Sequence, residues 1–416
     1  MQRVSSDMAT TDMQFHLRRQ EDALRNLQNQ ISSANRLQRL RDDPLAAAHA
    51  VRFESYLARL ERFENNTLYA KDFFNHVDIY LQRAVDVMQR IRELAVTGAH
   101  GIYTADDTRH MAMEVNELLK ELVAISNAVG PDGTKQLFAG DKVFTEPFRI
   151  VEGTVDRNRE QLVVAVEYRG SGAGRRAEIG ERNFTELDIW GGQAFWAERM
   201  QIFSQVDASQ WRAAENGSFF INGHEIPVRT GDTLPSIVHK INESGAAVHA
   251  SVDPQTRGLQ ITGTIPHLIR MEDAVGSRTL EELGIIQFNN DPAAPNWSPA
   301  ARVSGGSVFD MVIRLRDALY RGDTEFVGGL GIGGIDKGLN NLISRLAQNG
   351  SRHERAMVTW QRLNQEIPNV TAMLAREVST NMARAITDMS MMDFAHRATL
   401  QTAARIIPPT LLDFLR

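Results

Sequence analysis

Apolar residues recur at alternating spacings of three and four near the start of the chain. This first row covers residues 13–34 and consists of Met13, Leu17, Gln20, Leu24, Leu27, Ile31 and Ala34. A heptad row of this kind predicts a helix that packs against another helix. Asp43 and Pro44 then predict the start of a second helix, because aspartate caps free backbone amides and proline suits the first helical turn.

The next row keeps the same spacing over a longer distance. Its members are Tyr56, Leu60, Phe63, Thr67, Ala70, Phe74, Val77, Leu81, Ala84, Met88, Ile91 and Ala95. A helix over residues 44–96 would be about 80 Å long, and Gly98 and Gly101 are expected to end it. A shorter amphipathic pattern at 111–125 predicts a helix that folds back antiparallel. We therefore expect both phenylalanines of the row to lie in the core of a bundle.

Strand-like patterns replace the helical ones between about residues 131 and 304. Strands are predicted at 149–151, 161–168, 247–252 and 259–262, with a short helix at 234–242. Asn222 and Gly223 separate two β-rich runs, and this pair suits the tight turn of a β-hairpin. The proline-bearing stretch 289–301 is predicted to be a linker or an irregular loop.

Helical spacing returns after residue 305. One helix is predicted to end at Gly322, and a longer row then approaches Pro368, where we expect a break or a kink because proline removes a backbone donor. The stretch from Gly329 to Gly334 spells G-x-G-x-x-G, but a helix precedes it instead of a βαβ strand, so we interpret it as a flexible connection between helices. Residues 371–416 are rich in Ala and Met, and so apolar a segment needs a partner surface.

These patterns predict a mainly α chain with an inserted β-rich domain, in which the long terminal helices form a coiled-coil or bundle rod. The 416 residues include 46 Lys and Arg against 52 Asp and Glu, a net charge of −6 that argues against a nucleic-acid binder. Cysteine is absent, which excludes disulfides and thiolate sites. The N-terminus lacks the apolar core of a cleaved signal, and no apolar run predicts a membrane span. Such a chain fits the cytosol and equally fits export in an unfolded state.

Candidate catalytic chemistry is sparse. The G-x-S-x-G, H-E-x-x-H and G-x-x-x-x-G-K-[ST] motifs do not occur. The spacing of His224, His239 and His249 does not suit a metal site, and we interpret them as scattered histidines. The glutamates of one helix face, Glu114, Glu117 and Glu121, are interpreted as a solvated surface. The prediction is a protein without enzymatic activity, cofactor or metal.

Several short motifs resemble those of the flagellin-like axial proteins. The run Asp42-Asp43-Pro44, preceded by Arg3-Val4-Ser5 and by residues 27–33, is similar to the N-terminal signature of that family, and more narrowly to hook-associated proteins of the hook–filament junction. Further similar positions are Arg92, Glu93 and Leu94, Asn222 and Gly223, and the final Leu411-Leu412-Asp413-Phe414-Leu415.

This resemblance implies a five-part organisation. The two ends, 1–43 and 371–416, would be the coiled-coil halves of an inner core. Residues 44–147 would form a helical rod with a hairpin, and 305–370 the C-terminal part of that rod. Residues 148–304 would be a β-rich outer domain, which we expect to be dispensable for ring contacts.

The resemblance also implies a structural role in the bacterial flagellum. The chain would be secreted unfolded by the flagellar type III apparatus with the help of an export chaperone, and it would assemble as a homo-oligomeric ring. The ring would join the first hook-associated protein on the hook side to flagellin on the filament side, outside the cell or in the periplasm where the flagellum is periplasmic. The expected assembly interface comprises Leu17, Leu24, Leu27, Ile31, Met382, Ile386, Met389, Met392, Leu411, Leu412, Phe414 and Leu415.

Two alternatives stay open at this point. One is a flagellin-type subunit that builds the filament itself. The other is an enzyme or a binding module that uses the central β region, although a catalytic constellation is missing from the sequence.

Overall fold

The computed structural model describes residues 6–39, 41–154, 161–287 and 296–406. The chain forms two compact units, which we name the terminal unit (residues 1–64 and 361–416) and the central unit (residues 65–360). Both long helices, α2 and α9, contribute residues to both units.

The chain is mainly helical, with a β-rich region inserted between helices, which confirms the predicted fold class. The helices are α1 (Ser6–Ser33), α2 (Pro44–Ala99), α3 (Ala105–Ser126), α4 (Gly191–Ala194), α5 (Leu234–Glu243), α6 (Thr279–Glu282), α7 (Val308–Arg321), α8 (Thr324–Phe326), the π-helical turn η1 (Val327–Gly331), α9 (Ile332–Val378) and α10 (Met382–Ile406). The strands are β1 (Phe148–Thr154), β2 (Gln161–Tyr168), β3 (Arg176–Gly180), β4 (Asn183–Glu186), β5 (Gln201–Ser204), β6 (Gly217–Ile221), β7 (His224–Val228), β8 (Val248–Val252), β9 (Leu259–Gly263), β10 (Met271–Asp273) and β11 (Ala301–Ser304).

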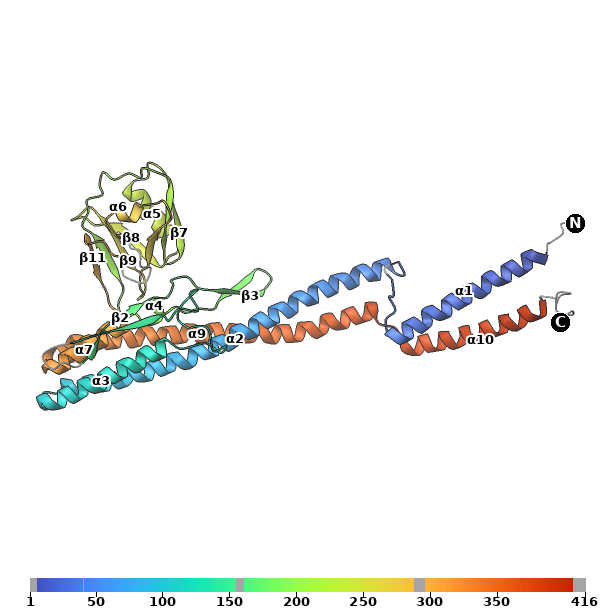
Figure 1. Cartoon of the computed structure of the whole chain (residues 1–416), viewed down its shortest axis with the longest axis horizontal. Coiled ribbons are helices and arrows are strands. Elements are labelled where there is room, and N and C mark those ends of the chain that lie inside the picture. The colour runs from blue at the N-terminus through green and yellow to red at the C-terminus, as the bar shows by residue number, and fades with distance from the viewer. Residues whose placement is uncertain (1–5, 40, 155–160, 288–295, 407–416) are drawn as a thin grey trace. The chain divides into compact units, whose positions relative to one another are not determined.

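In the terminal unit, α1 and α10 lie side by side (Figure 1). They run in opposite directions, since an antiparallel bridge joins Asn35 after α1 to Ser379 before α10. The start of α2 packs against the end of α9 through a small core of Leu60, Phe63, Leu363 and Val370. Phe63 is 5% exposed, so its predicted burial is confirmed.

Pro368 does not break the helix, because α9 continues through this residue to Val378. The other expectation, a kink at this position, stays a prediction. Proline cannot donate the backbone hydrogen bond expected at its position. Leu363, Ile367 and Val370 pack against α2, whereas Pro368 is exposed, and this packing offsets the missing bond. The chain leaves the helix only at residues 379–381.

The long apolar row is the core of the helical part of the central unit. Every member from Thr67 to Ala95 is completely buried, which confirms the prediction for Phe74 as well. The helix α2 ends at Ala99, so Gly98 lies inside it instead of ending it. A Cβ at Gly98 would lie 2.5 Å from Leu319 Cδ2, so this glycine allows α7 to approach closely.

The helix α3 follows a capping box formed by Thr104 and Asp107. It runs back along α2, where Arg90 and Glu114 form an ion pair of 2.7 Å. Packing against α7 covers its other apolar positions. The glutamates on its outer face are exposed, and Glu117 pairs with Lys120 of the same helix. The predicted folding back of this helix is therefore confirmed.

A buried arginine on α7 joins three elements of this core. Arg316 has no exposed surface. Its guanidinium donates to Asn116 Oδ1 of α3 at 2.9 Å and to the carbonyl of Val163 in β2 at 2.7 Å. The neighbouring Asp317 carboxylate accepts a further bond at 2.6 Å. The charge is thus fully hydrogen-bonded, as a buried guanidinium requires.

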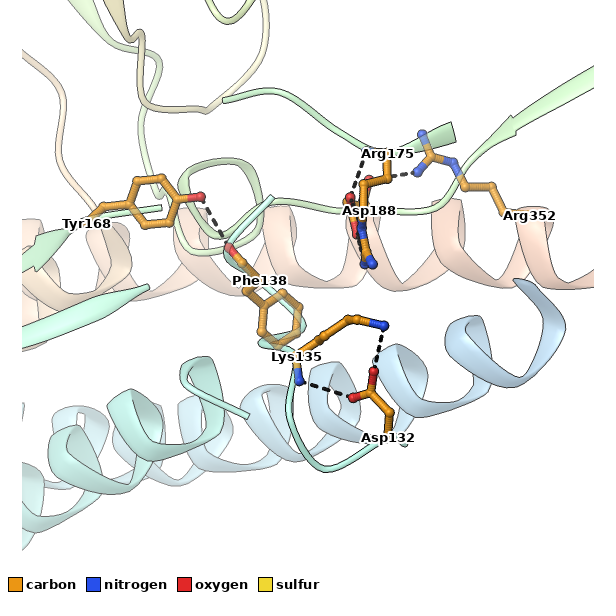
Figure 2. A network of polar contacts seen from close by, with 7 residues as sticks. All are labelled: Asp132, Lys135, Phe138, Tyr168, Arg175, Asp188 and Arg352. Atoms are coloured by element: carbon orange, nitrogen blue, oxygen red, sulfur yellow. Dashed lines mark hydrogen bonds and ion pairs between the residues drawn. The ribbon is translucent and has the colours of Figure 1, made fainter. Parts of the chain in front are cut away.

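Strands β1 to β4 share the core of these helices. β1 and β2 form an antiparallel hairpin, and so do β3 and β4. The ring of Phe148 lies 5.0 Å from that of Phe309 and 5.5 Å from that of Phe195. Figure 2 shows how polar contacts reinforce this region: Tyr168 donates to the carbonyl of Phe138 at 3.1 Å, and burial raises the pKa of Tyr168. Residues 148–197 therefore pack with the helices.

Polar contacts of Asp188, which follows β4, connect this region to α9. The guanidinium of Arg175 lies 2.7 Å from the buried carboxylate of Asp188, and this pairing raises the pKa of Arg175. Arg352 of α9 donates to the backbone carbonyl of Asp188 at 3.2 Å (Figure 2). Because Arg175 precedes β3 and Asp188 follows β4, their ion pair closes the base of the β3–β4 hairpin, and the Arg352 bond holds this base against the long helix.

Residues 200–286 form a second core, which together with β11 we name the β lobe. Its two antiparallel sheets have the strand orders β11-β5-β9-β8 and β10-β6-β7. The predicted hairpin turn is confirmed, with positive φ at Asn222 (50°) and Gly223 (81°). The chain enters and leaves this lobe at adjacent points, since Ala197 and Glu198 both donate their amides to Gly306 O, at 3.0 and 3.2 Å.

The glycine-rich stretch before α9 is helical, so the expected flexible connection is wrong. It forms the π-helical turn η1 and continues directly into α9. A Cβ at Gly334 would lie 2.8 Å from Met311 Sδ, and one at Gly331 would lie 3.2 Å from a Leu315 methyl group. These glycines let α7 pack closely against the helical backbone, which sequence spacing alone does not reveal.

Candidate assembly surface

The seam of α1 is covered by α10. Every member of the predicted row from Met13 to Ile31 is half-buried. On α10 the facing row begins at Ala385 and ends at Ala403, both almost completely buried. Its other members, Met389, Met392, His396 and Thr399, are half-buried. Leu17, Leu24, Leu27, Ile31, Met389 and Met392 of the expected assembly interface therefore face the helix pair itself.

A second apolar face of α10 is open. Phe394 is 76% exposed and Met391 is 67% exposed, and Met382, Ile386 and Leu400 are exposed as well. Phe394 lies nine residues after Ala385, which is two and a half helical turns, so it points almost directly away from the row that faces α1. We name the exposed apolar residues of α10 the open face: Met382, Ile386, Met391, Phe394 and Leu400. At about 100° per residue they are spread around the side of the helix that α1 does not cover.

The outer surface of α1 is different in chemistry. Between its seam positions it carries the exposed charged residues Arg18, Arg19, Glu21, Asp22 and Arg25. Phe15 is its large exposed apolar residue among those described. Of the paired helices, α10 thus offers the apolar contact area, and α1 offers a charged surface.

The Asp42-Asp43-Pro44 motif builds the turn between α1 and α2. Asp43 Oδ1 accepts from the amide of Ala46 at 3.0 Å and so caps α2, which Pro44 begins. Asp42 Oδ2 accepts from the amide of Arg39 at 2.9 Å. Arg36 bonds Asp43 and also donates to Glu377 O of α9 at 2.9 Å. The motif therefore has a local structural role.

The other motif residues lie in the central unit. Arg92 forms an ion pair of 2.6 Å with Asp336, so it joins α2 to α9. Glu93 pairs with Arg90 on its own helix, and Leu94 is buried. These contacts stabilise the helical part.

The hairpin motif of the β lobe also makes structural contacts. The side chain of Asn222 donates to Ala246 O and lies 3.0 Å from His267 Nε2, and it accepts from the amide of Arg270. Gly223 passes Ala173 so closely that a Cβ would lie 3.2 Å from the alanine methyl group. Asn222 therefore ties the turn to a neighbouring segment.

Some expected positions lie outside the described residues. These are Arg3, Val4 and Ser5, residues 288–295 of the proline-bearing stretch, and Leu411, Leu412, Phe414 and Leu415. Met391, Phe394 and Leu400 were not predicted as members of the open face. The residues of this face do not recur at spacings of three and four, so periodicity gave no signal for them.

The residues that the structure describes give few other sites. Within those ranges, no three His, Asp or Glu side chains come together to hold a metal ion. None of the helices in the same ranges is long and apolar enough to cross a membrane.

Residues 4–142 match the family model of the bacterial flagellin N-terminal helical region. The first third of the chain is therefore similar to the flagellins. This finding confirms the resemblance to the axial proteins, and it covers the first three helices of the fold. The flagellin-like N-terminal region thus includes α1, α2 and α3.

Curated relatives match less than a third of the chain. Flagellin FlaB1 of Treponema pallidum is 32% identical over 125 residues, which are 30% of this chain and 43% of the relative. The flagellar filament 33 kDa core protein of Treponema phagedenis is 34% identical over 107 residues, 26% of this chain and 37% of the relative. The matched part is less than half the length of either relative.

Solved structures of hook-associated proteins are also similar to this chain. Flagellar hook-associated protein-3 of Legionella pneumophila is 16% identical, with a TM-score of 0.46 over 78% of this chain and 97% of that one. A putative flagellar hook-associated protein of Vibrio parahaemolyticus is 11% identical, with a TM-score of 0.48 over 81% of this chain and all of that one.

Proposed function

We propose that this flagellin-like protein is a structural subunit of the bacterial flagellum at the junction of hook and filament. The observation that carries the proposal is the open apolar face of α10 on a chain with a flagellin N-terminal region. A monomer gains nothing from five exposed apolar side chains on one helix, whereas an assembly buries them between neighbours. The Asp42-Asp43-Pro44 motif and the Leu411 to Leu415 ending favour the junction over the filament itself.

The proposed subunit leaves the cell unfolded through the flagellar type III apparatus, with an export chaperone, and forms a homo-oligomeric ring. One side of the ring contacts the first hook-associated protein, and the other contacts flagellin. In this arrangement α1 and α10 form the inner core, the long helices surround it, and the β-rich residues lie outside. Met382 and Ile386 remain interface residues in the proposal, joined by Met391, Phe394 and Leu400.

A filament subunit is the second candidate. The curated relatives are themselves flagellins and filament core proteins, and this similarity favours the alternative. Both candidates use the same open face of α10, but they differ in copy number. In the described residues of the β lobe, no three His, Asp or Glu side chains come together to hold a metal ion.

Stoichiometry in purified flagella separates the two candidates. The junction protein is expected as a trace component relative to flagellin, because a ring contains few subunits and a filament contains many. Immunogold labelling should then mark one position, next to the hook. A dominant band with labelling along the filament would contradict the junction proposal and support the filament subunit.

The open face is tested separately with a point variant. Phe394→Asp should abolish incorporation into flagella while the far-UV circular dichroism of the purified chain stays unchanged, because Phe394 makes little contact within the monomer. Asn26→Asp, at an exposed polar position on the charged outer surface of α1, is the control and should incorporate normally. Normal incorporation of Phe394→Asp would contradict the role of this face.

A further inference from the structure

Polar side chains interrupt the seam between α1 and α10 at one level. Gln20 Nε2 of α1 donates to Thr399 Oγ1 of α10 at 3.2 Å. His396 lies one turn before Thr399 on the same face of α10. We name Gln20, His396 and Thr399 the polar layer.

The polar layer is only partly hydrogen-bonded. The Thr399 hydroxyl donates to Ala395 O at 2.8 Å, so its oxygen is left to accept from the Gln20 amide. Gln20 Oε1 and His396 Nδ1 are both buried, and neither has a hydrogen-bond partner in the described part of the chain. Buried polar atoms without partners destabilise the structure that contains them. The layer therefore weakens the helix pair relative to an apolar seam.

The rest of the seam has little to define its alignment. Leucines on α1 face Met389 and Met392 on α10, and methionine adapts to many neighbours because its side chain is flexible. A single polar position in such a seam specifies partner and register at a cost in stability. The polar layer fits this role, because it makes one interhelical hydrogen bond and leaves other polar atoms unbonded at a cost in stability.

Contacts at the connectors hold one end of the pair. Arg36 donates its amide to Val378 O at 2.7 Å, and Thr380 donates its amide to Ala34 O at 2.9 Å. The polar layer lies two heptads from these contacts along α1, so a second determinant is needed there to keep the helices aligned.

We infer that the polar layer determines which helix α1 pairs with and in which register. In the native pair, the Thr399 hydroxyl oxygen accepts a hydrogen bond from the side-chain amide of Gln20. If α10 instead packed against α10 of a second copy, two sets of His396 and Thr399 would meet without this amide. The layer thus favours pairing within one chain over pairing between like ends, independently of the function proposed above.

The absence of cysteine allows a direct test in the full-length chain. Residue 27 lies seven positions after Gln20 and residue 392 lies seven before Thr399, so the antiparallel register places them opposite each other. Leu27→Cys with Met392→Cys reports the native register. Leu27→Cys with Ala385→Cys reports a slip of one heptad. In the otherwise unchanged chain, only the first pair should form an intrachain disulfide.

The decisive variant makes the layer apolar with Gln20→Leu, His396→Leu and Thr399→Leu together. Removal of the orphaned polar atoms should slow proteolytic cleavage within α1 and α10 by about tenfold. At the same time, the slipped disulfide or interchain disulfides should appear beside the native one. A native disulfide alone, at the yield of the parent, would overturn the inference, and so would faster cleavage.

Two matched variants separate specificity from general disturbance. Exchange of the partners by Gln20→Thr with Thr399→Gln restores an interhelical hydrogen bond and should keep the native disulfide alone. Leu24→Met changes the seam beside the layer without a polar group and should also keep the parent pattern. Mixed registers in the exchange variant would overturn the assigned role of the Gln20–Thr399 bond.

Discussion

Arg36 and Asp43 are joined across the turn between α1 and α2, with 3.1 Å between guanidinium and carboxylate. The same arginine donates to the carbonyl of Glu377 near the end of α9, and the same aspartate caps α2. One ion pair therefore connects the beginning of one long helix to the end of the other. The sequence motif that resembles the axial proteins coincides with this connection.

The charge of Asp43 should make the first turn of α2 sensitive to acid. The amide of Ala46, and then the Arg36 side chain, hold the pKa of Asp43 below its ordinary value of 3.8. Because the pKa of Asp43 is lower in the folded state, the ionised carboxylate stabilises the turn fully at pH values above 3.8. This stabilisation is lost as the pH falls through the lowered folded-state pKa. Hydrogen exchange of the first amides of α2 should therefore accelerate, relative to intrinsic rates, below about pH 3.8.

Asp43→Asn tests this account, because asparagine still caps a helix but does not ionise. The variant should lose the acid-dependent step in exchange at Ala46. Asp22→Asn, at an exposed position of α1, should leave that step in place. An unchanged pH profile in Asp43→Asn would show that another group causes the step.

Phe74→Ala should strongly lower the free energy of unfolding. Phe74 is completely buried in the helical core of the central unit, so truncation leaves a cavity. The expected loss is about 3–5 kcal/mol in urea unfolding of the purified chain.

Phe63→Ala should also cost about 3 kcal/mol or more, but its smaller core lies in the terminal unit. Phe144→Ala, at a ring that is 79% exposed, is the matched control and should change stability by less than about 0.5 kcal/mol. Losses below about 1 kcal/mol at both buried positions would contradict the packing described here.

Arg316→Ala should destabilise the central unit by more than about 2 kcal/mol. The substitution leaves Asn116 Oδ1 and the Val163 carbonyl buried without the donor that they share. Chemical denaturation of the variant measures this loss. Arg314→Ala on the exposed side of the same helix should stay within about 0.5 kcal/mol of the parent. Equal stability of the two variants would mean that water replaces the guanidinium.

The β lobe should be removable without loss of the helical core. Residues 197 and 306 are hydrogen-bonded neighbours, so a short Gly-Ser linker from Arg199 to Gly305 can replace residues 200–304. The shortened chain should unfold cooperatively, as followed by circular dichroism. Deletion of 148–304 should instead unfold the central unit, because it removes Phe148 and Phe195 from the helical core. Cooperative folding of the longer deletion would contradict the division into two cores.

The paired ends should be the first part of the isolated chain to be cleaved. In α1 and α10, the fully buried residues among those described are Ala385 and Ala403, and two small side chains contribute little burial energy. Limited proteolysis at physiological salt should therefore trim both helices and leave a fragment of about residues 45–370. Resistance of the full-length chain would show that the pair is stable without neighbours.

Much of the helical architecture could be predicted because burial follows spacing. The row from Tyr56 to Ala95 has one face, and that face is the core. The hairpin turn at Asn222 and Gly223 could be predicted for a similar reason, since its backbone conformation depends on two adjacent residues. The break expected at Pro368 does not occur, because the energetic penalty of a proline is local whereas the contacts that offset it come from α2. Tyr56 of α2 and Glu366 of α9, for example, are hydrogen-bonded although they lie 310 residues apart in the sequence.

The sequence by itself determined the buried face of α2, the hairpin turn at Asn222, and the flagellin-like signature at the start of the chain. Tertiary structure alone decided that α10 has one face against α1 and another left open, since both faces are apolar and spacing does not distinguish them. It also decided that Arg316 is buried, because an arginine is stable inside a core only when acceptors from distant segments surround it. Local patterns report the preferences of neighbouring residues, whereas these features depend on which distant segments come together.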